Sequence, residues 1–297
     1  MIKKLLKKVR HFFTAPVLEA LQAQQSVKGR EFQILLSLKY KDMLRNQVPL
    51  PSFDEVGFRV YSDNEEDGIL LYIFSLIGTT NKKVVDIGSG AVQGSNSANL
   101  IVNHGWVGLL IDGNEKAIEA ARNFYSTCPD TKNYPPLLVH AWITAENIND
   151  KIAEHGFAGE IDLLSIDIDG IDYWMWKAID CIQPRVVVVE YQDIIGPDKA
   201  LTVAYRPDFK RSDYDVNARD PLYAGASLPA FVKLGKQKGY RLVGCNRYGY
   251  NAFFVRSDLG TECLPQVPAE SCFKHPWNVY GMENLFPKVQ DMDWVEV

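Results

Sequence analysis

The chain has 297 residues, of which 46% are hydrophobic and 23% charged, and its formal net charge is −5. This size and composition allow one sizeable core and exclude a disordered chain, and the acidic balance argues against a general nucleic-acid binder. The 5 cysteines are scattered and form no C-x-x-C pair, so we expect neither a disulfide framework nor a zinc site. No apolar run of about 18 residues occurs, so we expect a cytoplasmic protein.

Residues 1–56 are predicted to form an N-terminal helical extension, because Pro49 and Pro51 stop a helical pattern. Within residues 1–13, lysines and an arginine alternate with apolar residues at helical spacing. Such a helix can make peripheral contact with the inner face of an anionic membrane. It can equally pack on a partner and leave its lysines in solvent, and the sequence leaves both readings open.

From Phe58 onward, apolar runs alternate with amphipathic stretches, a pattern typical of βαβ units around a parallel sheet. A first helix is predicted between a cap at Ser62 and Gly78. The next helices are predicted from near Ser95 to Gly105, from about Glu115 to Tyr125, and up to Gly156. The predicted strands are residues 83–87, 107–112, 137–142, 161–167 and 185–190. The last of these is valine except at its ends, as expected for a central strand that is buried on both faces.

A glycine-rich turn and an acid follow the first two predicted strands. In the turn, Asp86-Ile87-Gly88-Ser89-Gly90, small residues let backbone amides approach a ligand, and Asp112 can accept hydrogen bonds from both hydroxyls of a ribose. Ligands of open α/β sheets lie at the carboxyl ends of the strands. The sequence therefore predicts a nucleoside-containing cofactor held by residues at these strand ends, namely Asp86, Gly88, Ser89, Gly90, Asp112, Gly113, Ala141 and Trp142.

The spacing of the glycines indicates which nucleoside is bound. A dinucleotide-binding turn reads G-x-G-x-x-G, whereas Gly94 falls one position too late for that pattern. Asp86 is unfavourable beside a pyrophosphate but suits the ammonium group of a methionine moiety. Both observations favour S-adenosylmethionine over NAD, and hence a methyltransferase over a dehydrogenase.

Several segments also carry a family resemblance, namely residues 84–90, 109–114, 161–170, 239–242 and 251–255. They resemble FkbM-type class I methyltransferases, over roughly residues 60–257. The resemblance implies a doubly wound, Rossmann-like α/β fold with a seven-stranded sheet, whose last two strands, residues 240–245 and 251–256, form an antiparallel hairpin. It further implies O-methylation of a sugar, glycan or similar small natural product, as in polysaccharide biosynthesis. Residues 62–68 resemble an entry motif that closes one side of the cofactor pocket, although helix capping alone would also explain them.

Acids at the ends of the fourth and fifth strands are the candidate catalytic groups. Methyl transfer to an alcohol usually needs a base, and carboxylates that converge from neighbouring strands can also bind a hard cation. The set is similar to that of metal-dependent sugar O-methyltransferases of the macrocin type. That similarity implies Asp167 and Glu190 as Mg²⁺ ligands and Asp169 as the base, with Asp172 nearby.

The sequence departs from the macrocin-type pattern at Tyr191, where those enzymes have a further acid. In FkbM-type enzymes the segment that corresponds to Asp167-Ile168-Asp169-Gly170 need not bind metal. Metal-assisted catalysis, metal-free catalysis by Asp169, and acids that only orient the substrate therefore remain open.

The methyltransferase domain is predicted to span residues 57–258 and to contain a long insert at 196–225, followed by an aromatic C-terminal tail at 259–297. The insert is too long for a plain connection, and its Tyr, Asp and Arg residues predict a lid that binds the acceptor. A solvated surface excursion is the alternative. The tail aromatics are predicted to pack on the domain or on a second subunit, which would make a homo-oligomer.

A different class of function is a non-catalytic or differently reacting Rossmann-like module. Its N-terminal helix would tether it to a membrane-associated polysaccharide assembly complex. The acids Asp86, Asp112, Asp167 and Asp169 argue against a non-catalytic module. An inactive site has no physical reason to keep several carboxylates close together.

Overall fold

The computed structural model describes residues 29–214 and 222–297, so the predicted basic helix of residues 1–13 lies outside the described part. The chain divides into two units, residues 1–49 and residues 50–297. In the first unit, residues 29–45 form a helix. No helix in the described ranges is long and apolar enough to cross a membrane.

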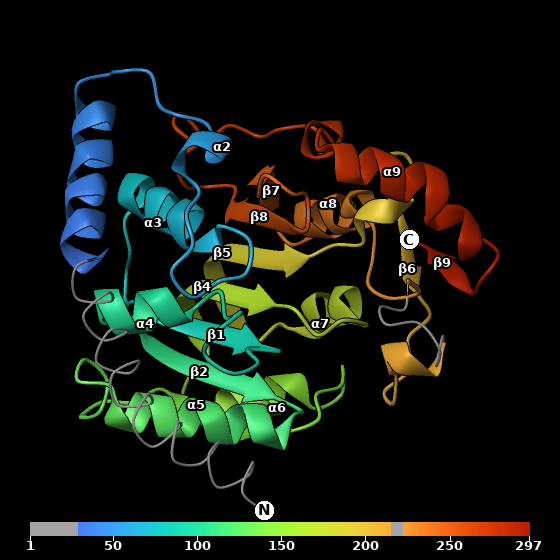
Figure 1. The fold of residues 1–297 in the computed structure, drawn as a ribbon, viewed down its shortest axis with the longest axis horizontal. Coiled ribbons are helices and arrows are strands. Elements are labelled where there is room, and N and C mark those ends of the chain that lie inside the picture. Colours follow the sequence, from blue (N-terminus) through green and yellow to red (C-terminus); the bar gives the residue numbers. More distant parts are fainter. Residues whose placement is uncertain (1–28, 215–221) are drawn as a thin grey trace, which may run out of the picture. The chain divides into compact units, whose positions relative to one another are not determined.

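The described residues of the second unit form nine strands (Figure 1). They are β1 (Lys83–Ile87), β2 (Val107–Asp112), β3 (Leu137–His140), β4 (Gly159–Ile166), β5 (Ile182–Glu190), β6 (Leu201–Val203), β7 (Tyr240–Cys245), β8 (Asn251–Arg256) and β9 (Trp294–Glu296). The α-helices of this unit are α2 (Phe53–Val56), α3 (Glu66–Ile77), α4 (Ala98–His104), α5 (Glu115–Thr127), α6 (Ile148–Ala153), α7 (Asp172–Ala178), α8 (Leu228–Gln237) and α9 (Pro276–Asn284). Four short 3₁₀ turns complete it, η1 (Asp193–Ile195), η2 (Arg211–Asp213), η3 (Ala269–Cys272) and η4 (Phe286–Lys288).

Seven of the strands form one sheet in the order β3-β2-β1-β4-β5-β8-β7. Strands β1 to β5 are parallel, while β8 runs antiparallel to both β5 and β7. The predicted fold class is therefore confirmed: the chain has a doubly wound, Rossmann-like α/β sheet of seven strands, with the expected antiparallel hairpin at one edge.

The middle of β5 is fully apolar. Residues 186–189 of β5 are 0% exposed, as expected for a parallel strand covered on both faces. Trp176 of α7 packs against Phe231 of α8 and Phe254 of β8, with ring centroids 6.2 and 5.0 Å apart. Figure 1 shows β1, β2, β4 and β5 ending toward the same side, where α7, β6 and β9 lie.

The entry to α3 is organised by a buried carboxylate. The cap residue is Glu65, with φ of 75°, and not Ser62 as predicted. Oδ2 of Asp67 accepts hydrogen bonds from the backbone N–H groups of Val60, Tyr61 and Ser62 at 2.7, 2.7 and 2.9 Å. Ser62 Oγ in turn accepts one from the N–H of Asp67 at 3.2 Å. The predicted entry motif therefore folds its own loop tightly onto the start of α3.

The same loop lies beside the glycine-rich turn. Ser62 forms a parallel bridge with Gly94, and the Gly94 N–H donates to the carbonyl of Tyr61 at 2.8 Å. A Cβ on Gly94 would lie 3.0 Å from a carboxylate oxygen of Asp63. The segment thus caps the helix and also stands beside the turn that follows β1.

The insert and the tail are joined by a second, two-stranded sheet. Strand β6 of the insert pairs antiparallel with β9, so that Val203 lies opposite Trp294. The Trp294 ring packs against Tyr223 at 4.7 Å between centroids, and the Tyr223 hydroxyl donates to the carbonyl of Asp293 at 2.6 Å. Tail aromatics therefore pack on the insert itself.

The burial of Asp67 gives a testable pH dependence. Burial raises the pKa of Asp67 to about 6, so the folded chain keeps a proton that the unfolded chain releases near its ordinary pKa. Stability is therefore lost as pH rises from about 4 to about 6. Relative to Asp67→Asn, the wild type should lose up to ~3 kcal/mol of unfolding free energy across this window. Urea unfolding of both proteins at several pH values tests this, and parallel pH profiles would contradict it.

Candidate active site

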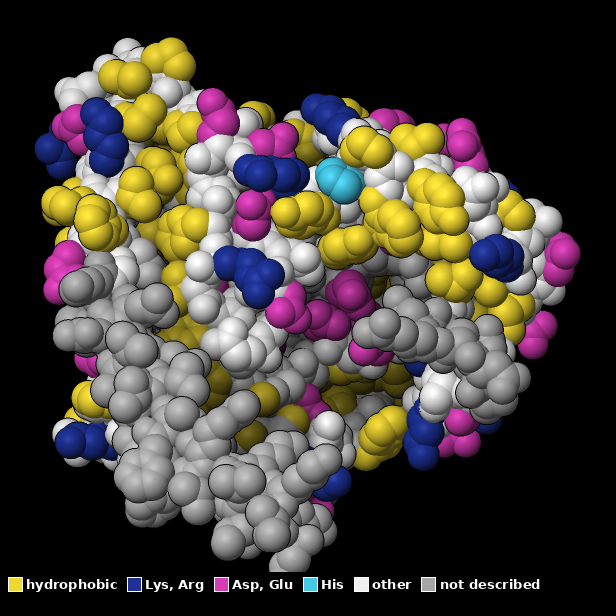
Figure 2. Space-filling view, viewed as in Figure 1, with side chains coloured by type: hydrophobic (Ala, Val, Ile, Leu, Met, Phe, Trp, Pro, Cys, Tyr) yellow, Lys and Arg dark blue, Asp and Glu magenta, His cyan; other side chains and the backbone are white. Residues whose placement is uncertain are grey.

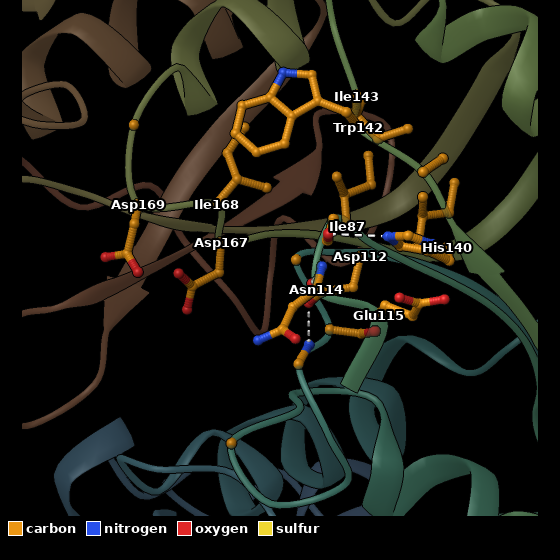
Figure 3. A pocket seen from close by; sticks show the side chains of 18 of the residues that line it. Ile87, Asp112, Asn114, Glu115, His140, Trp142, Ile143, Asp167, Ile168 and Asp169 are labelled. Atoms are coloured by element: carbon orange, nitrogen blue, oxygen red, sulfur yellow. Dashed lines mark hydrogen bonds between the residues drawn. The ribbon is translucent and has the colours of Figure 1, made fainter. Parts of the chain in front are cut away.

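A cavity of about 1010 Å³ opens at the carboxyl ends of the parallel strands. It is lined by the loops that follow β1, β2, β3 and β4, together with Asp63 from the entry loop and Phe209 from the insert. Figure 3 shows the labelled side chains arranged around it, with Asp167 and Asp169 on one side and Asp112, Asn114 and Glu115 on another. The cavity lies where an open α/β sheet is expected to hold its ligand.

The turn after β1 is built on very close backbone contacts. Gly88 has φ of 78°, and a Cβ on it would lie 1.8 Å from the carbonyl oxygen of Asp167. Gly90 has φ of 61° but open space around it. Ser89 between them is 2% exposed and lines the cavity, and within the described structure its Oγ has no hydrogen-bond partner. A buried hydroxyl of this kind is expected to have a ligand or water as partner.

Replacement of Gly88 and of Gly90 by alanine should lower the unfolding free energy by different amounts. Gly88→Ala must displace the backbone that leaves β4 and should lower the unfolding free energy by about 3 kcal/mol or more. Gly90→Ala adds left-handed strain without a clash and should cost about 1–2 kcal/mol. Denaturant unfolding without ligand measures both. Equal losses would mean that the contact at Gly88 relaxes freely.

Asp112 is held rigidly at the end of β2. Its Oδ2 accepts a hydrogen bond from the Gly90 N–H at 2.7 Å, and its Oδ1 accepts one from the Asn114 N–H at 2.6 Å. A carboxylate oxygen has two lone pairs, so each oxygen can accept one further hydrogen bond. The carboxylate lines the cavity, so its remaining lone pairs can accept hydrogen bonds from a ligand there.

The other predicted residues after β2 and β3 lie on the same wall. The carbonyl of Gly113 lies 3.1 Å from Nε2 of His140, and the Ala141 N–H donates to the carbonyl of Asp112 at 3.0 Å. Trp142 is 50% exposed, and its Nε1 donates to the carbonyl of Pro207 at 2.7 Å. The third strand ends at His140 rather than at Trp142 as predicted, so Ala141 and Trp142 belong to the loop that faces the cavity.

Asp86 is placed differently from the other predicted cofactor residues. It does not line the cavity; it is buried beneath the turn and accepts hydrogen bonds from Ser95 Oγ at 2.8 Å and Ser97 Oγ at 2.6 Å. Burial raises the pKa of Asp86. Both serine side chains bind Asp86 and precede the helix, so α4 begins at Ala98 and not near Ser95 as predicted. Asp86 thus connects the end of β1 to the start of α4.

The acids after β4 and β5 converge as predicted. One carboxylate oxygen each of Asp167, Asp169 and Glu190 lie within 4.8 Å of one another. Asp167 and Asp169 line the cavity, whereas Glu190 is not among its lining residues. Desolvation, followed by the charges of Asp172 and Asp169, raises the pKa of Asp167 well above its ordinary value. Desolvation and the charge of Asp167 act in the same direction on the pKa of Glu190.

Asp169 differs from its neighbours in conformation and exposure. Its backbone has φ of 55°, rare for a residue other than glycine, and its side chain is 60% exposed. Nη1 of Arg211, from the insert, contacts its Oδ1 at 2.5 Å. Backbone outliers held by their surroundings are frequent at functional sites. This ion pair was not predicted from the sequence.

Two further residues of this region have structural roles. The Asp172 carboxylate accepts hydrogen bonds from the N–H groups of Ile168 at 2.8 Å and Gly170 at 2.9 Å, which shapes the loop after β4. Burial raises the pKa of Asp172 to about 6. Tyr191 is buried, and its hydroxyl donates to the carbonyl of Cys272 at 3.2 Å. The position where macrocin-type enzymes have a further acid is thus used here to anchor the tail.

Comparisons with known proteins add a likeness of fold. No family model and no curated protein matches the chain. Similar solved structures include the mitomycin 7-O-methyltransferase MmcR (17% identity, TM-score 0.36), covering 61% of this chain and 50% of MmcR. Others are an O-methyltransferase from Bacillus cereus in complex with SAH (15%, TM-score 0.40, 76% and 97% covered) and magnesium protoporphyrin IX methyltransferase from Synechocystis PCC 6803 with bound SAM (13%, TM-score 0.37, 65% and 78%). Likeness at this level does not decide the activity, and the FkbM-type assignment stays a prediction.

Proposed function

We propose that this chain is an S-adenosylmethionine-dependent methyltransferase. The charge of the cavity carries the proposal: its described lining contains five acids, Asp63, Asp112, Glu115, Asp167 and Asp169, against one lysine or arginine, Lys116. Figure 2 likewise shows acidic side chains gathered in a hollow. S-adenosylmethionine brings a sulfonium and an ammonium cation, whereas NAD brings an anionic pyrophosphate. An acidic cavity favours the cationic cofactor.

The shape of the glycine-rich turn supports the same choice. The Gly94 N–H is bonded to the entry loop, and α4 begins only at Ala98. No helix therefore starts at the third glycine, where a dinucleotide fold presents a helix N-terminus to the pyrophosphate. The hydroxyls of a ribose fit Asp112, and the unpartnered Ser89 Oγ is available to the rest of the cofactor. The bound cofactor supplies an electrophilic methyl group.

The exposed carboxylate of Asp169 supports transfer to oxygen. Asp169 would accept the proton of the acceptor hydroxyl while the cofactor supplied the methyl group to that oxygen. The products are the methyl ether and S-adenosylhomocysteine. In line with the FkbM-type resemblance, we propose a sugar, glycan or similar small natural product of polysaccharide biosynthesis as the acceptor.

The converging acids also fit a divalent metal. Three carboxylate oxygens within 4.8 Å of one another form the donor set of a hard cation. We propose Asp167 and Glu190 as ligands of Mg²⁺, which would lower the pKa of the acceptor hydroxyl. Asp169, paired with Arg211, remains the base.

The cofactor site is tested by Asp112→Ala with calorimetric titration of S-adenosylhomocysteine. Loss of two hydrogen bonds to a carboxylate should weaken binding at least ~10-fold. Glu119→Ala, an exposed acid on α5, is the matched control and should bind as the wild type does. Titration of NAD completes the test. If the protein binds NAD but does not bind S-adenosylhomocysteine, a dehydrogenase replaces the proposal.

The base is tested by Asp169→Asn. This variant should bind S-adenosylhomocysteine normally, while formation of S-adenosylhomocysteine from S-adenosylmethionine, with a cell extract as acceptor source, should fall ~10²–10⁴-fold. Unchanged turnover would remove Asp169 as the base. Cofactor binding without turnover in the wild type would instead favour the non-catalytic module.

The metal is tested without an acceptor. Millimolar Mg²⁺ should raise the unfolding temperature of the wild type, because binding to the folded state alone stabilises it. Glu190→Gln should lose this shift. If the wild type shows no shift either, catalysis by Asp169 without metal replaces this part of the proposal.

A further inference from the structure

The stretch of the insert from Tyr205 to Phe209 is held against the loops that line the cavity, and Phe209 reaches the cavity itself. The Tyr205 hydroxyl donates to Oε2 of Glu146 at 2.6 Å and accepts from the N–H of Ala145 at 3.0 Å. Trp142 is bonded to the carbonyl of Pro207, as described above. Phe209 lines the cavity and packs so closely on Gly170 that a Cβ there would lie 2.6 Å from its ring. These contacts tie the insert to the loops after β3 and β4.

Two adjacent cations follow this stretch. Nζ of Lys210 lies 5.8 Å from the centre of the Trp142 ring, and Arg211 contacts Asp169. Both contacted residues line the cavity. The acids of the site thus belong mainly to the strand ends, whereas the insert brings positive charge to the side where an acceptor must reach Asp169.

The proposed proton transfer changes the charge of Asp169, the residue that pairs with Arg211. A hydroxyl that gives its proton to Asp169 must lie within hydrogen-bond distance of that carboxylate, and hence close to Arg211. When Asp169 takes up the proton, it loses its negative charge, so its pairing with Arg211 weakens. An anionic group on an acceptor bound beside Asp169 lies within reach of Arg211, and a guanidinium binds carboxylates and phosphates in a fork geometry.

We infer that the acceptor carries a carboxylate or a phosphate next to the hydroxyl that is methylated, and that Arg211, with Lys210 beside it, binds this anion. The inference rests on the proposed methyltransferase function. It makes Arg211 a specificity-determining residue, which selects acidic over neutral acceptors. Charge-assisted hydrogen bonds of this kind are about twice as strong as neutral ones.

The test is calorimetric titration of the protein loaded with S-adenosylhomocysteine. The probes are D-glucuronate and glucose 6-phosphate, which separate carboxylate from phosphate, with D-glucose as the neutral match. We expect at least one anion to bind ~10-fold or more tightly than glucose. Arg211→Gln should abolish that preference. Asp169→Asn should strengthen it, because the competing carboxylate is gone.

Arg206→Gln is the matched control, since Arg206 lies on the same insert but is exposed and pairs with Asp208. It should keep the preference. If both anions bind no more tightly than glucose, or if Arg211→Gln keeps the preference, the inference is wrong. If the protein does not bind S-adenosylhomocysteine in the loading step, the proposed function itself fails. The two failures are therefore distinguishable.

Discussion

The site depends on one backbone contact, between the turn that leaves β1 and the chain that leaves β4. At Gly88 the two backbones are so close that no side chain fits between them. The contact follows from the parallel pairing of β1 with β4, which ends both strands at the same level. It places the glycine-rich turn beside Asp167, so the groups proposed to hold the cofactor and those proposed to act on the acceptor form one cavity.

Around this contact, the acidic and the basic side chains come from different parts of the fold. The sheet supplies acids at its strand ends, and these suit a cationic cofactor. The insert supplies Lys210 and Arg211, which contact the cavity residues Trp142 and Asp169. Positive charge from the insert therefore stands beside Asp169, next to the acids of the strand ends.

Local sequence patterns were sufficient for most of the sheet. Strands β1 and β2 have the bounds predicted from their apolar runs, whereas the bounds of the hairpin strands β7 and β8 were implied by the family resemblance. The start of α4 was misplaced because Ser95 and Ser97 bind the buried Asp86, although the Ser-x-Ser spacing could have suggested it. The pair of Arg211 with Asp169 joins residues 42 positions apart, so no local pattern could predict it.

The pairing of β6 with β9 affects the order in which parts of the chain can fold during synthesis. The strands of the main sheet are complete once Arg256 has been synthesised, whereas β6 waits for residues 294–296 as its partner. During translation the half of the cavity with Gly88 and Asp112 can therefore fold first. The insert gains its pairing with β9 only when residues 294–296 have emerged from the ribosome, so this side of the cavity would be the last to become ordered.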